Sequence, residues 1–270
     1  MLGEMALPRL QLFEFNDSPW CPRALSDTII ESLSRTLAWG GFLRGLVAPF
    51  EAFLAAADAD ELLDVGAGAG GPARIFCREI LRAGRTPPRF VLTDLQPQLE
   101  AWQTARDAFP GVIDFVATPV DATAIPPDLA QGRARLIINA FHHFSPELAR
   151  SILRDAVHGS AGVFIAEAFE RNPLGFVSLW PYGLPALLAN PILSPRDRLQ
   201  KLVMTFASPT VLAASLWDGL VSTMRVYSRD ELEAMAAELE HEDGRRFTWT
   251  YGTYPSPFGG RGYYFYGVPL

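Results

Sequence analysis

Five short apolar segments alternate with segments of helical periodicity between residues 61 and 169. Each apolar segment is nearly continuous rather than polar at every second position, which is typical of strands covered on both faces. We predict these strands at ELLDV, RFVLTDL, VIDFVAT, ARLIINA and GVFIAEAF. Strands that alternate with helices in this way form a sheet between two layers of helices. The pattern therefore predicts an α/β, Rossmann-like, doubly wound fold.

A glycine-rich turn directly follows the first of these strands. The run GAGAGG places four glycines within residues 66–71, and Pro72 then suits the first turn of a helix. Glycine has no Cβ, so the backbone can bend sharply here and lie close to a ligand. The backbone N–H groups at a helix N-terminus also lack partners within the helix. The turn is therefore a candidate site for a nucleotide-like ligand.

Three aspartates mark the ends of the first three predicted strands. Asp64 lies inside the first strand, where a carboxylate suits a cationic ligand better than a phosphate. Asp94 ends the second strand, where a carboxylate can accept hydrogen bonds from ribose hydroxyls, and Asp121-Ala122 follows the third. Ligands of open α/β sheets bind at this edge. The alternatives are a turn or cap for Asp94 and Asp121, and a structural hydrogen bond for Asp64.

Taken together, these segments resemble the class I S-adenosylmethionine-dependent methyltransferases. The resemblance covers about residues 60–170 and rests on LLDVGAGAG, VLTDL, VDATAIP and LIINAFHHF in that order. Each motif is common by itself, and the ordered set is what carries the resemblance. It implies a seven-stranded sheet whose last strand inserts antiparallel, and S-adenosylmethionine as the cofactor.

The resemblance also implies a cofactor site. Its predicted members are Asp64, Gly66, Gly68, Gly70, Asp94, Leu95, Asp121, Ala122 and Asn139. The three glycines would let the backbone approach the cofactor, and Asp64 would lie near its methionyl amino group. Asp94 would bind the ribose hydroxyls, while Asp121 and Ala122 would border the adenine.

The segment NAFHHF follows the fourth strand, where by resemblance the methyl group is transferred. Methyl transfer requires an aligned acceptor, and a general base helps when the acceptor is a hydroxyl. His142 and His143 are the candidate catalytic bases, because histidine titrates near neutral pH. The alternative is that one histidine caps the next helix or binds the cofactor carboxylate. Asn139 departs from the Asn/Asp-Pro-Pro-aromatic pattern of enzymes that methylate exocyclic base nitrogens, so DNA-base methylation loses support.

The pattern divides the chain into three parts. In residues 1–58 the pattern predicts an aromatic-rich strap followed by helices. Together they would form a helical N-terminal extension that acts as a lid. Residues 59–170 and 226–270 predict the methyltransferase core, in which RRFTWTYG and GYYFYGVP form the terminal strands. Residues 171–225 are largely apolar and interrupted by prolines, and they are too long for a simple loop. They predict a helical cap insertion.

The strap and the residues from the cap onward contain aromatic and charged side chains that suit an apolar or aromatic acceptor. The candidate substrate-binding residues are Trp20, Trp180, Tyr182, Trp217, Asp218, Arg225 and Tyr227. The alternative is that the aromatic members pack the cap onto the sheet.

Composition narrows the partners and the compartment. The net charge of −7 argues against a nucleic-acid partner. Two cysteines without a disulfide framework or secretory signal predict a cytoplasmic protein, and no histidine or cysteine spacing suggests a metal site. The apolar residues 176–193 are interrupted by three prolines and short for a bilayer span of about 20 residues. A cap, or less favourably a surface that touches a membrane, fits them better than a span.

The leading hypothesis is an S-adenosylmethionine-dependent methyltransferase that modifies an O or N atom of a small, fairly hydrophobic molecule. The run GAGAGG also satisfies the G-x-G-x-x-G pattern, which leaves an NAD(P)-dependent oxidoreductase as an alternative that Asp64 disfavours. A non-catalytic protein that binds S-adenosylmethionine on the same fold is the second alternative, because a fold does not determine chemistry. The identity of the acceptor and the oligomeric state stay open.

Overall fold

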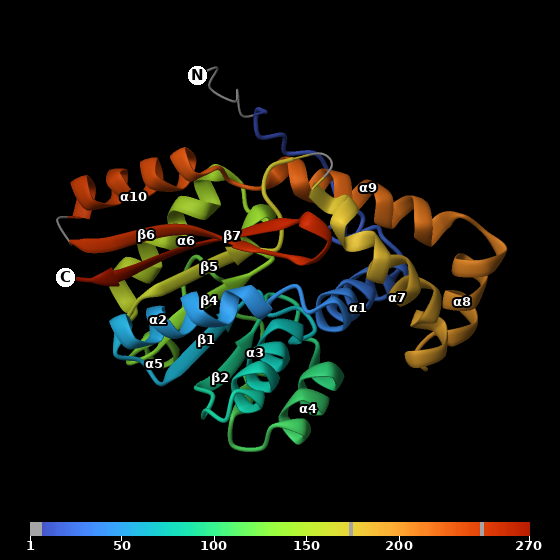
Figure 1. The fold of residues 1–270 in the computed structure, drawn as a ribbon, viewed down its shortest axis with the longest axis horizontal. Coiled ribbons are helices and arrows are strands. Elements are labelled where there is room, and N and C mark those ends of the chain that lie inside the picture. The colour runs from blue at the N-terminus through green and yellow to red at the C-terminus, as the bar shows by residue number, and fades with distance from the viewer. Residues whose placement is uncertain (1–6, 173–174, 244–245) are drawn as a thin grey trace.

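The computed structural model describes residues 7–172, 175–243 and 246–270 of the chain. The described strands form one seven-stranded sheet of order β3-β2-β1-β4-β5-β7-β6 (Figure 1). They are β1 (Glu61–Val65), β2 (Arg89–Thr93), β3 (Ile113–Phe115), β4 (Ala134–Ile138), β5 (Val163–Glu167), β6 (Phe247–Pro255) and β7 (Arg261–Pro269). The first five strands are parallel, whereas β7 pairs antiparallel with both β5 and β6. The predicted α/β sheet with an inserted antiparallel last strand is confirmed.

Helices cover both faces of the sheet. The α-helices are α1 (Arg23–Gly40), α2 (Val47–Ala57), α3 (Gly71–Arg82), α4 (Leu99–Ala108), α5 (Pro127–Ala130), α6 (Pro146–Gly159), α7 (Trp180–Leu193), α8 (Arg198–Leu202), α9 (Thr210–Arg225) and α10 (Arg229–Asp243). Shorter turns are η1 (Arg44–Leu46), η2 (Phe141–His143), η3 (Gly175–Leu179), the π-helical η4 (Val203–Ala207) and η5 (Pro257–Gly259). Helices α2, α3 and α4 lie on one face, and α6 and α10 on the other (Figure 1).

Aromatic packing fixes the first βα unit in place. Phe50 of α2 stacks on Phe76 of α3, with ring centroids 4.4 Å apart, and Phe90 of β2 lies against the same ring of Phe50. All three side chains are fully buried, so α3 cannot shift along the sheet without losing this contact. The glycine turn between β1 and α3 is thereby held at the carboxyl edge of the sheet.

The segment between β5 and α10 folds into the helices α7, α8 and α9 with the turns η3 and η4. Residues 7–22, which we call the strap, form no helix or strand and run along α9, where the Leu10 N–H donates to the Met224 carbonyl at 3.0 Å. Helix α7 packs along α1. These elements make the lobe at the right of Figure 1.

One helical stretch among the described residues, Gly175–Leu193, is long and apolar enough by length and composition to cross a membrane, with a mean hydropathy of 1.2. Two bent helix pairs would also qualify if each were a single span. Pro185 and Pro191 lie inside α7, and the buried Asn190 donates a hydrogen bond to Glu31 of α1 at 2.9 Å. Helix α7 is therefore joined to α1 by polar as well as apolar contacts.

Candidate active site

The three glycines of the β1–α3 turn have different structural reasons to be glycine. Gly66, Gly68 and Gly70 all lie in the left-handed region, with φ of 69°, 52° and 71°. A Cβ on Gly70 would lie 2.9 Å from Leu92 Cδ1, so this glycine permits close packing against β2. A Cβ on Gly68 would meet no described atom within 4 Å. The backbone at Gly68 therefore borders open space, which is the condition for close approach of a ligand.

Asp94 is tied to that turn. Its Oδ2 accepts a hydrogen bond from the Gly68 N–H at 3.0 Å, and its Oδ1 accepts one from the Gln96 N–H at 2.9 Å. An ionised carboxylate has about four lone-pair sites, so oxygen lone pairs remain for two hydroxyl donors. Leu95, 64% exposed, follows directly and leaves a large apolar side chain uncovered beside this carboxylate.

Asp64 is a buried acid with an unfilled hydrogen-bonding position. It is 1% exposed, and its Oδ2 has no hydrogen-bond partner among the described residues. Burial, reinforced by the nearby Asp94, raises the pKa of Asp64 to about 7. A carboxylate in this state is stabilised by a cation or by N–H donors. The orphaned oxygen therefore fits an ammonium group, such as the methionyl amino group of S-adenosylmethionine.

The substitution Asp64→Asn should stabilise the cofactor-free protein progressively as the pH rises. The folded pKa is about 7, whereas an unfolded aspartate titrates near ~3.9. A raised folded pKa contributes stability that is full below the unfolded value and is lost as the pH rises through the folded value. The difference in unfolding free energy, variant minus wild type, should grow by about 2.5 kcal/mol from pH 5 to pH 8. Urea titrations of both proteins at both pH values measure this difference. If it is the same at pH 5 and pH 8, the buried Asp64 carboxylate is not unpaired.

Asp121 and Asn139 form the outer and inner limits of the predicted cofactor site. Asp121 is exposed, and its Oδ1 accepts hydrogen bonds from the Thr123 N–H and hydroxyl at 2.8 and 2.7 Å. The turn-capping role that the sequence left open is therefore present, while contact of Asp121 and Ala122 with adenine stays a prediction. Asn139 has a φ of 53°, and its Oδ1 accepts from the Ala168 N–H at 2.6 Å.

An apolar cavity lies beside Asn139, under the lobe formed by α1, α7 and α9. Its described lining consists of Asn16, Ile29, Ser32, Leu33, Thr36, Asn139, His142, His143, Phe169, Phe176, Leu179, Trp180, Gly183, Leu184, Leu187, Leu212, Ser215, Asp218, Gly219 and Ser222. Its volume is about 130 Å³, roughly ten times what one buried water needs. The cavity shares Asn139 with the predicted cofactor site, so a molecule held in it lies next to that site.

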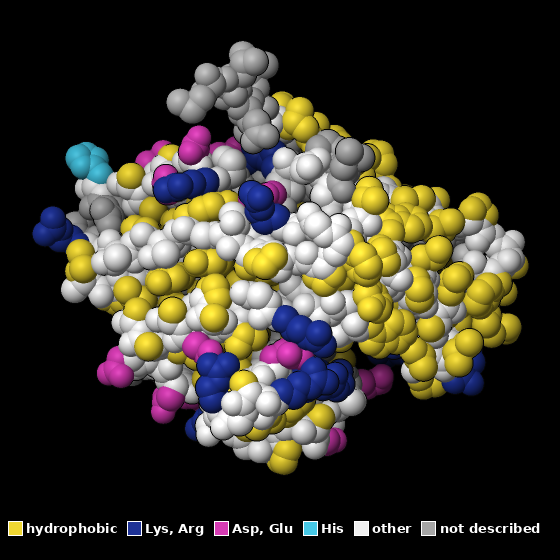
Figure 2. Space-filling model, in the orientation of Figure 1, with side chains coloured by type: hydrophobic (Ala, Val, Ile, Leu, Met, Phe, Trp, Pro, Cys, Tyr) yellow, Lys and Arg dark blue, Asp and Glu magenta, His cyan; other side chains and the backbone are white. Residues whose placement is uncertain are grey.

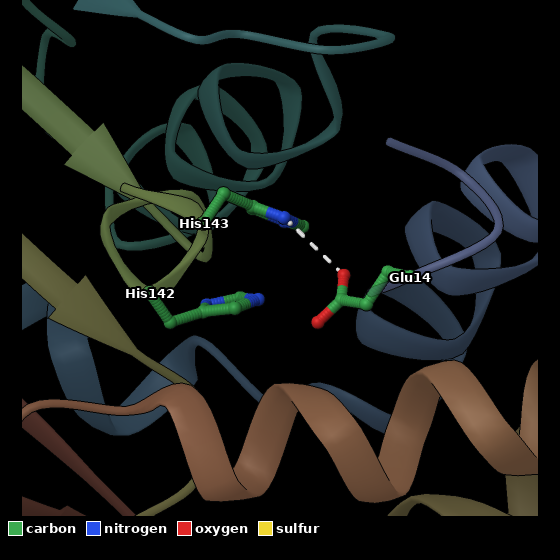
Figure 3. Close-up of side chains that lie close together, drawn as sticks. All are labelled: Glu14, His142 and His143. Atoms are coloured by element: carbon green, nitrogen blue, oxygen red, sulfur yellow. Dashed lines mark ion pairs between the residues drawn. The ribbon is translucent and has the colours of Figure 1, made fainter. Parts of the chain in front are cut away.

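His142 and the buried Glu167 form a hydrogen-bonded pair at the floor of this cavity. The Nδ1 of His142 lies 2.8 Å from Oε2 of Glu167, and the His142 backbone N–H donates to Oε1 at 3.0 Å. Because the carboxylate accepts, Nδ1 is the donor of this hydrogen bond, and Nε2 is the ring nitrogen that Glu167 does not engage. Figure 3 shows that the outer edge of the His142 ring points toward Glu14. This geometry fixes the ring of His142 through Nδ1 and leaves Nε2 on the side of the cavity.

His143 is held in a different charge environment, although its ring contacts that of His142 in a tilted arrangement at a centroid distance of 4.1 Å. Its Nδ1 lies 2.9 Å from Asp17 Oδ2 and 3.2 Å from Glu14 Oε2, and both acids are on the strap. Figure 3 shows the contact with Glu14. Burial acts to lower the pKa of His143, but the two carboxylates outweigh it and raise the pKa to about 9. His143 is therefore protonated at neutral pH and binds the strap rather than accepting a proton.

Arg225 completes this cluster. Its guanidinium Nη1 lies 2.7 Å from Asp17 Oδ2 and 3.3 Å from Glu14 Oε1. Glu14, His142 and His143 also offer ligand atoms within 4.8 Å of one another, the spacing of a metal site. The Arg225 guanidinium and the proton on His143 already balance the two carboxylates. We therefore interpret the cluster as an ion-pair network that fastens the strap.

Two of the seven candidate substrate-binding residues, Trp180 and Asp218, line the cavity. The described lining does not include the other five, which are Trp20, Tyr182, Trp217, Arg225 and Tyr227. Trp217 Nε1 donates to the Phe13 carbonyl at 3.0 Å, and the Tyr227 hydroxyl donates to the Phe144 carbonyl at 2.8 Å. Asp218 accepts hydrogen bonds from the backbone of the strap as well as lining the cavity.

The sequence reasoning missed Glu14, Asp17 and Glu167. Glu167 had a usable signal, because it is a charged residue at the carboxyl end of a buried strand, where ligands of such sheets bind. Glu14 and Asp17 had none, since they lie in a segment without periodicity more than a hundred residues from His143. The apolar cavity wall from α1, including Ile29 and Leu33, was also missed.

Comparison with known proteins shows similarity in fold rather than in sequence. No protein-family model matches the chain, and no curated protein matches it by sequence. The methyltransferase domain of bacterial CtHen1 superposes with a TM-score of 0.51 at 12% identity, over 84% of this chain and 99% of that one. The plantazolicin methyltransferase BpumL, solved with S-adenosylhomocysteine, gives 0.52 at 10% identity, over 95% and 93%.

A third solved structure is the O-methyltransferase NcsB1 from neocarzinostatin biosynthesis. It holds S-adenosylmethionine and 2-hydroxy-5-methyl naphthoic acid, and it superposes with a TM-score of 0.53 at 14% identity. The match covers 92% of this chain but only 59% of NcsB1. These likenesses, together with the sheet order, establish that the chain has the fold of the class I S-adenosylmethionine-dependent methyltransferases.

Proposed function

We propose that this protein is an S-adenosylmethionine-dependent methyltransferase that modifies a hydroxyl oxygen of a small, hydrophobic molecule. The observation that carries the proposal is the His142–Glu167 pair facing an apolar cavity that shares Asn139 with the predicted cofactor site. The candidate base, the cavity for the acceptor and the predicted cofactor site therefore adjoin one another. An N-methyltransferase has less need of a base, which is why we favour oxygen over nitrogen as the methylated atom.

The residues at the sheet edge fit the cofactor. The unpartnered Oδ2 of Asp64 suits the methionyl ammonium, and the carboxylate of Asp94 suits the ribose hydroxyls. The open backbone at Gly68 lies between them along the turn. S-adenosylmethionine supplies a methyl group activated by its positively charged sulfur. Asp64 disfavours NAD(P) as the cofactor, because the pyrophosphate of NAD(P) would meet its carboxylate.

The role of the chain in the reaction is to orient the acceptor, exclude water and take up one proton. Nε2 of His142 accepts the hydroxyl proton as the acceptor oxygen forms its bond to the methyl carbon and the bond from that carbon to sulfur breaks. Glu167 then stabilises the imidazolium through Nδ1, and Glu14 lies on its other side. The strap, fastened over the cavity by His143 and Arg225, keeps water out.

The acceptor class follows from the cavity lining, in which the nine apolar side chains are large and most of the nine polar ones are small. Hydroxylated aromatic acids such as the naphthoic acid held by NcsB1 are suitable first probes. A nucleic-acid substrate is disfavoured by the net charge of −7.

The proposal includes a cytoplasmic location, because Cys21 and Cys77 are both free thiols, as in a reducing compartment.

Isothermal calorimetry with the full chain tests the proposal at its first step. We expect S-adenosylmethionine and S-adenosylhomocysteine to bind with micromolar dissociation constants, about −8 kcal/mol, and NAD to give no heat. Binding of NAD without S-adenosylmethionine would refute the proposal in favour of an oxidoreductase. Release of S-adenosylhomocysteine in the presence of hydroxynaphthoic acids then separates an active enzyme from a protein that only binds the cofactor.

A further inference from the structure

Exposed apolar side chains are concentrated on the lobe that covers the cavity. Among the described residues, 24 large hydrophobic side chains are exposed, and eleven of them lie between residues 175 and 225. That segment makes up only about a fifth of the chain. Figure 2 shows the result as a nearly continuous hydrophobic surface over the right-hand lobe, whereas the rest of this view is mixed. Such a patch on a folded protein marks an interaction surface.

The exposed residues follow helical spacing on two helices. On α7 they are Leu184, Leu188 and Ile192, and on α9 they are Leu212, Leu216 and Leu220. Each set has the spacing i, i+4, i+8, so each forms one stripe along its helix. The opposite side of each helix is buried, with Ala186 on α7 and Val221 on α9. We call the two stripes together the cap face.

The cap face is continuous with the cavity. Leu184 and Leu212, the first residue of each stripe, also line the cavity. They are 37% and 38% exposed, so each contributes both to the cavity wall and to the outer surface. An apolar molecule arriving at the cap face therefore reaches the cavity along an apolar route.

The charges of this lobe differ from those of the whole chain. Residues 175–225 contain four basic and two acidic residues, although the chain as a whole has a net charge of −7. Two of the basic residues are buried in ion pairs, which leaves Arg196 and Arg198 as the basic residues at the surface. Asp197 is the only exposed acid of this segment among the described residues, and the exposed Arg198 lies next to it at the start of α8. On the strap beside α9, Trp20 is 64% and Phe13 49% exposed. Apolar stripes flanked by arginine and exposed aromatic side chains are typical of surfaces that lie in a membrane interface.

We propose that the cap face docks on an anionic lipid bilayer, and that the acceptor passes from the bilayer into the cavity between Leu184 and Leu212. The second clause rests on the proposed function, whereas the docking itself does not. A second copy of the chain seated on the cap face would close this route. From the sequence, residues 176–193 favoured a cap over a surface that touches a membrane, and we now propose that the cap is such a surface. The prolines exclude a regular span but not a helix that lies flat on the surface.

Vesicle flotation with the full chain tests the docking. We expect the wild type to float with vesicles of phosphatidylcholine containing about 30 mol% phosphatidylglycerol, and about fivefold less with phosphatidylcholine alone. The double variant Leu188→Asp/Leu216→Asp should bind the anionic vesicles at least about tenfold more weakly, because two apolar contacts are lost. Neither residue lines the cavity.

The matched control is Leu81→Asp/Leu148→Asp, which changes two similarly exposed leucines on α3 and α6, and it should float like the wild type. A wild type that does not float overturns the proposal. If light scattering then shows a dimer that the first double variant dissociates, the cap face is an interface between copies. Calorimetry with S-adenosylmethionine in the absence of vesicles reports on the proposed function separately, so failure of one is distinguishable from failure of the other.

Discussion

Replacing His142 with alanine should lower kcat by about 10²- to 10⁴-fold and leave the affinity for S-adenosylmethionine unchanged. The Nδ1 of His142 is bound to Glu167, which leaves Nε2 for the acceptor, whereas His143 is held protonated by Asp17 and Glu14. Removing the imidazole of His142 leaves an acceptor hydroxyl without a group to take its proton. The measurement is the release of S-adenosylhomocysteine at saturating acceptor, together with cofactor calorimetry on the same variant.

Three comparisons separate this chemical role from a structural one. Added imidazole should restore part of the rate of His142→Ala, because a small base can enter the space that the side chain leaves. Glu167→Gln should also lower kcat, since an amide cannot hold the proton on Nδ1 or stabilise the imidazolium. His158→Ala, an exposed histidine on α6, should behave as the wild type. A wild-type rate for His142→Ala would remove this residue from the mechanism.

Replacing Gly68 with alanine should weaken S-adenosylmethionine binding by at least about 100-fold, or about 2.7 kcal/mol. The backbone here has a φ of 52°, and a Cβ would project into space that no described atom fills. In the cofactor complex we expect that space to be occupied, so the added methyl group should collide with the ligand. Calorimetry measures the affinity, and thermal unfolding measures the accompanying strain.

Gly84→Ala is the matched control for this experiment. Gly84 has a φ of 73°, and a Cβ on it would also meet no described atom within 4 Å, but it lies at the far end of α3. Both variants should lose about 1 kcal/mol of stability, because a side chain is strained in the left-handed region. Only Gly68→Ala should lose cofactor affinity. Equal affinities in the two variants would show that the turn does not bind the cofactor.

Much of the fold was predictable because the relevant signals are local. Runs of buried strand residues such as ARLIINA match β4, all of whose residues are buried, and the glycine turn lies where the spacing placed it. The third strand was predicted too long. VIDFVAT forms only the three residues of β3, because β3 lies at the edge of the sheet and pairs with β2 alone. The extent of an edge strand depends on its partner rather than on its own apolar run.

The sequence alone determines the succession of strands and helices along the chain, because short-range patterns of apolar and turn-forming residues specify them. It also determines that Gly68 and Asp94 lie at the same edge of the sheet. The different partners of His142 and His143 are determined only by the tertiary structure. The two residues are adjacent in sequence, yet one pairs with Glu167, 25 residues away, and the other with Asp17, 126 residues away. The protonation state of an imidazole depends on the charges around it, and only folding brings those charges together.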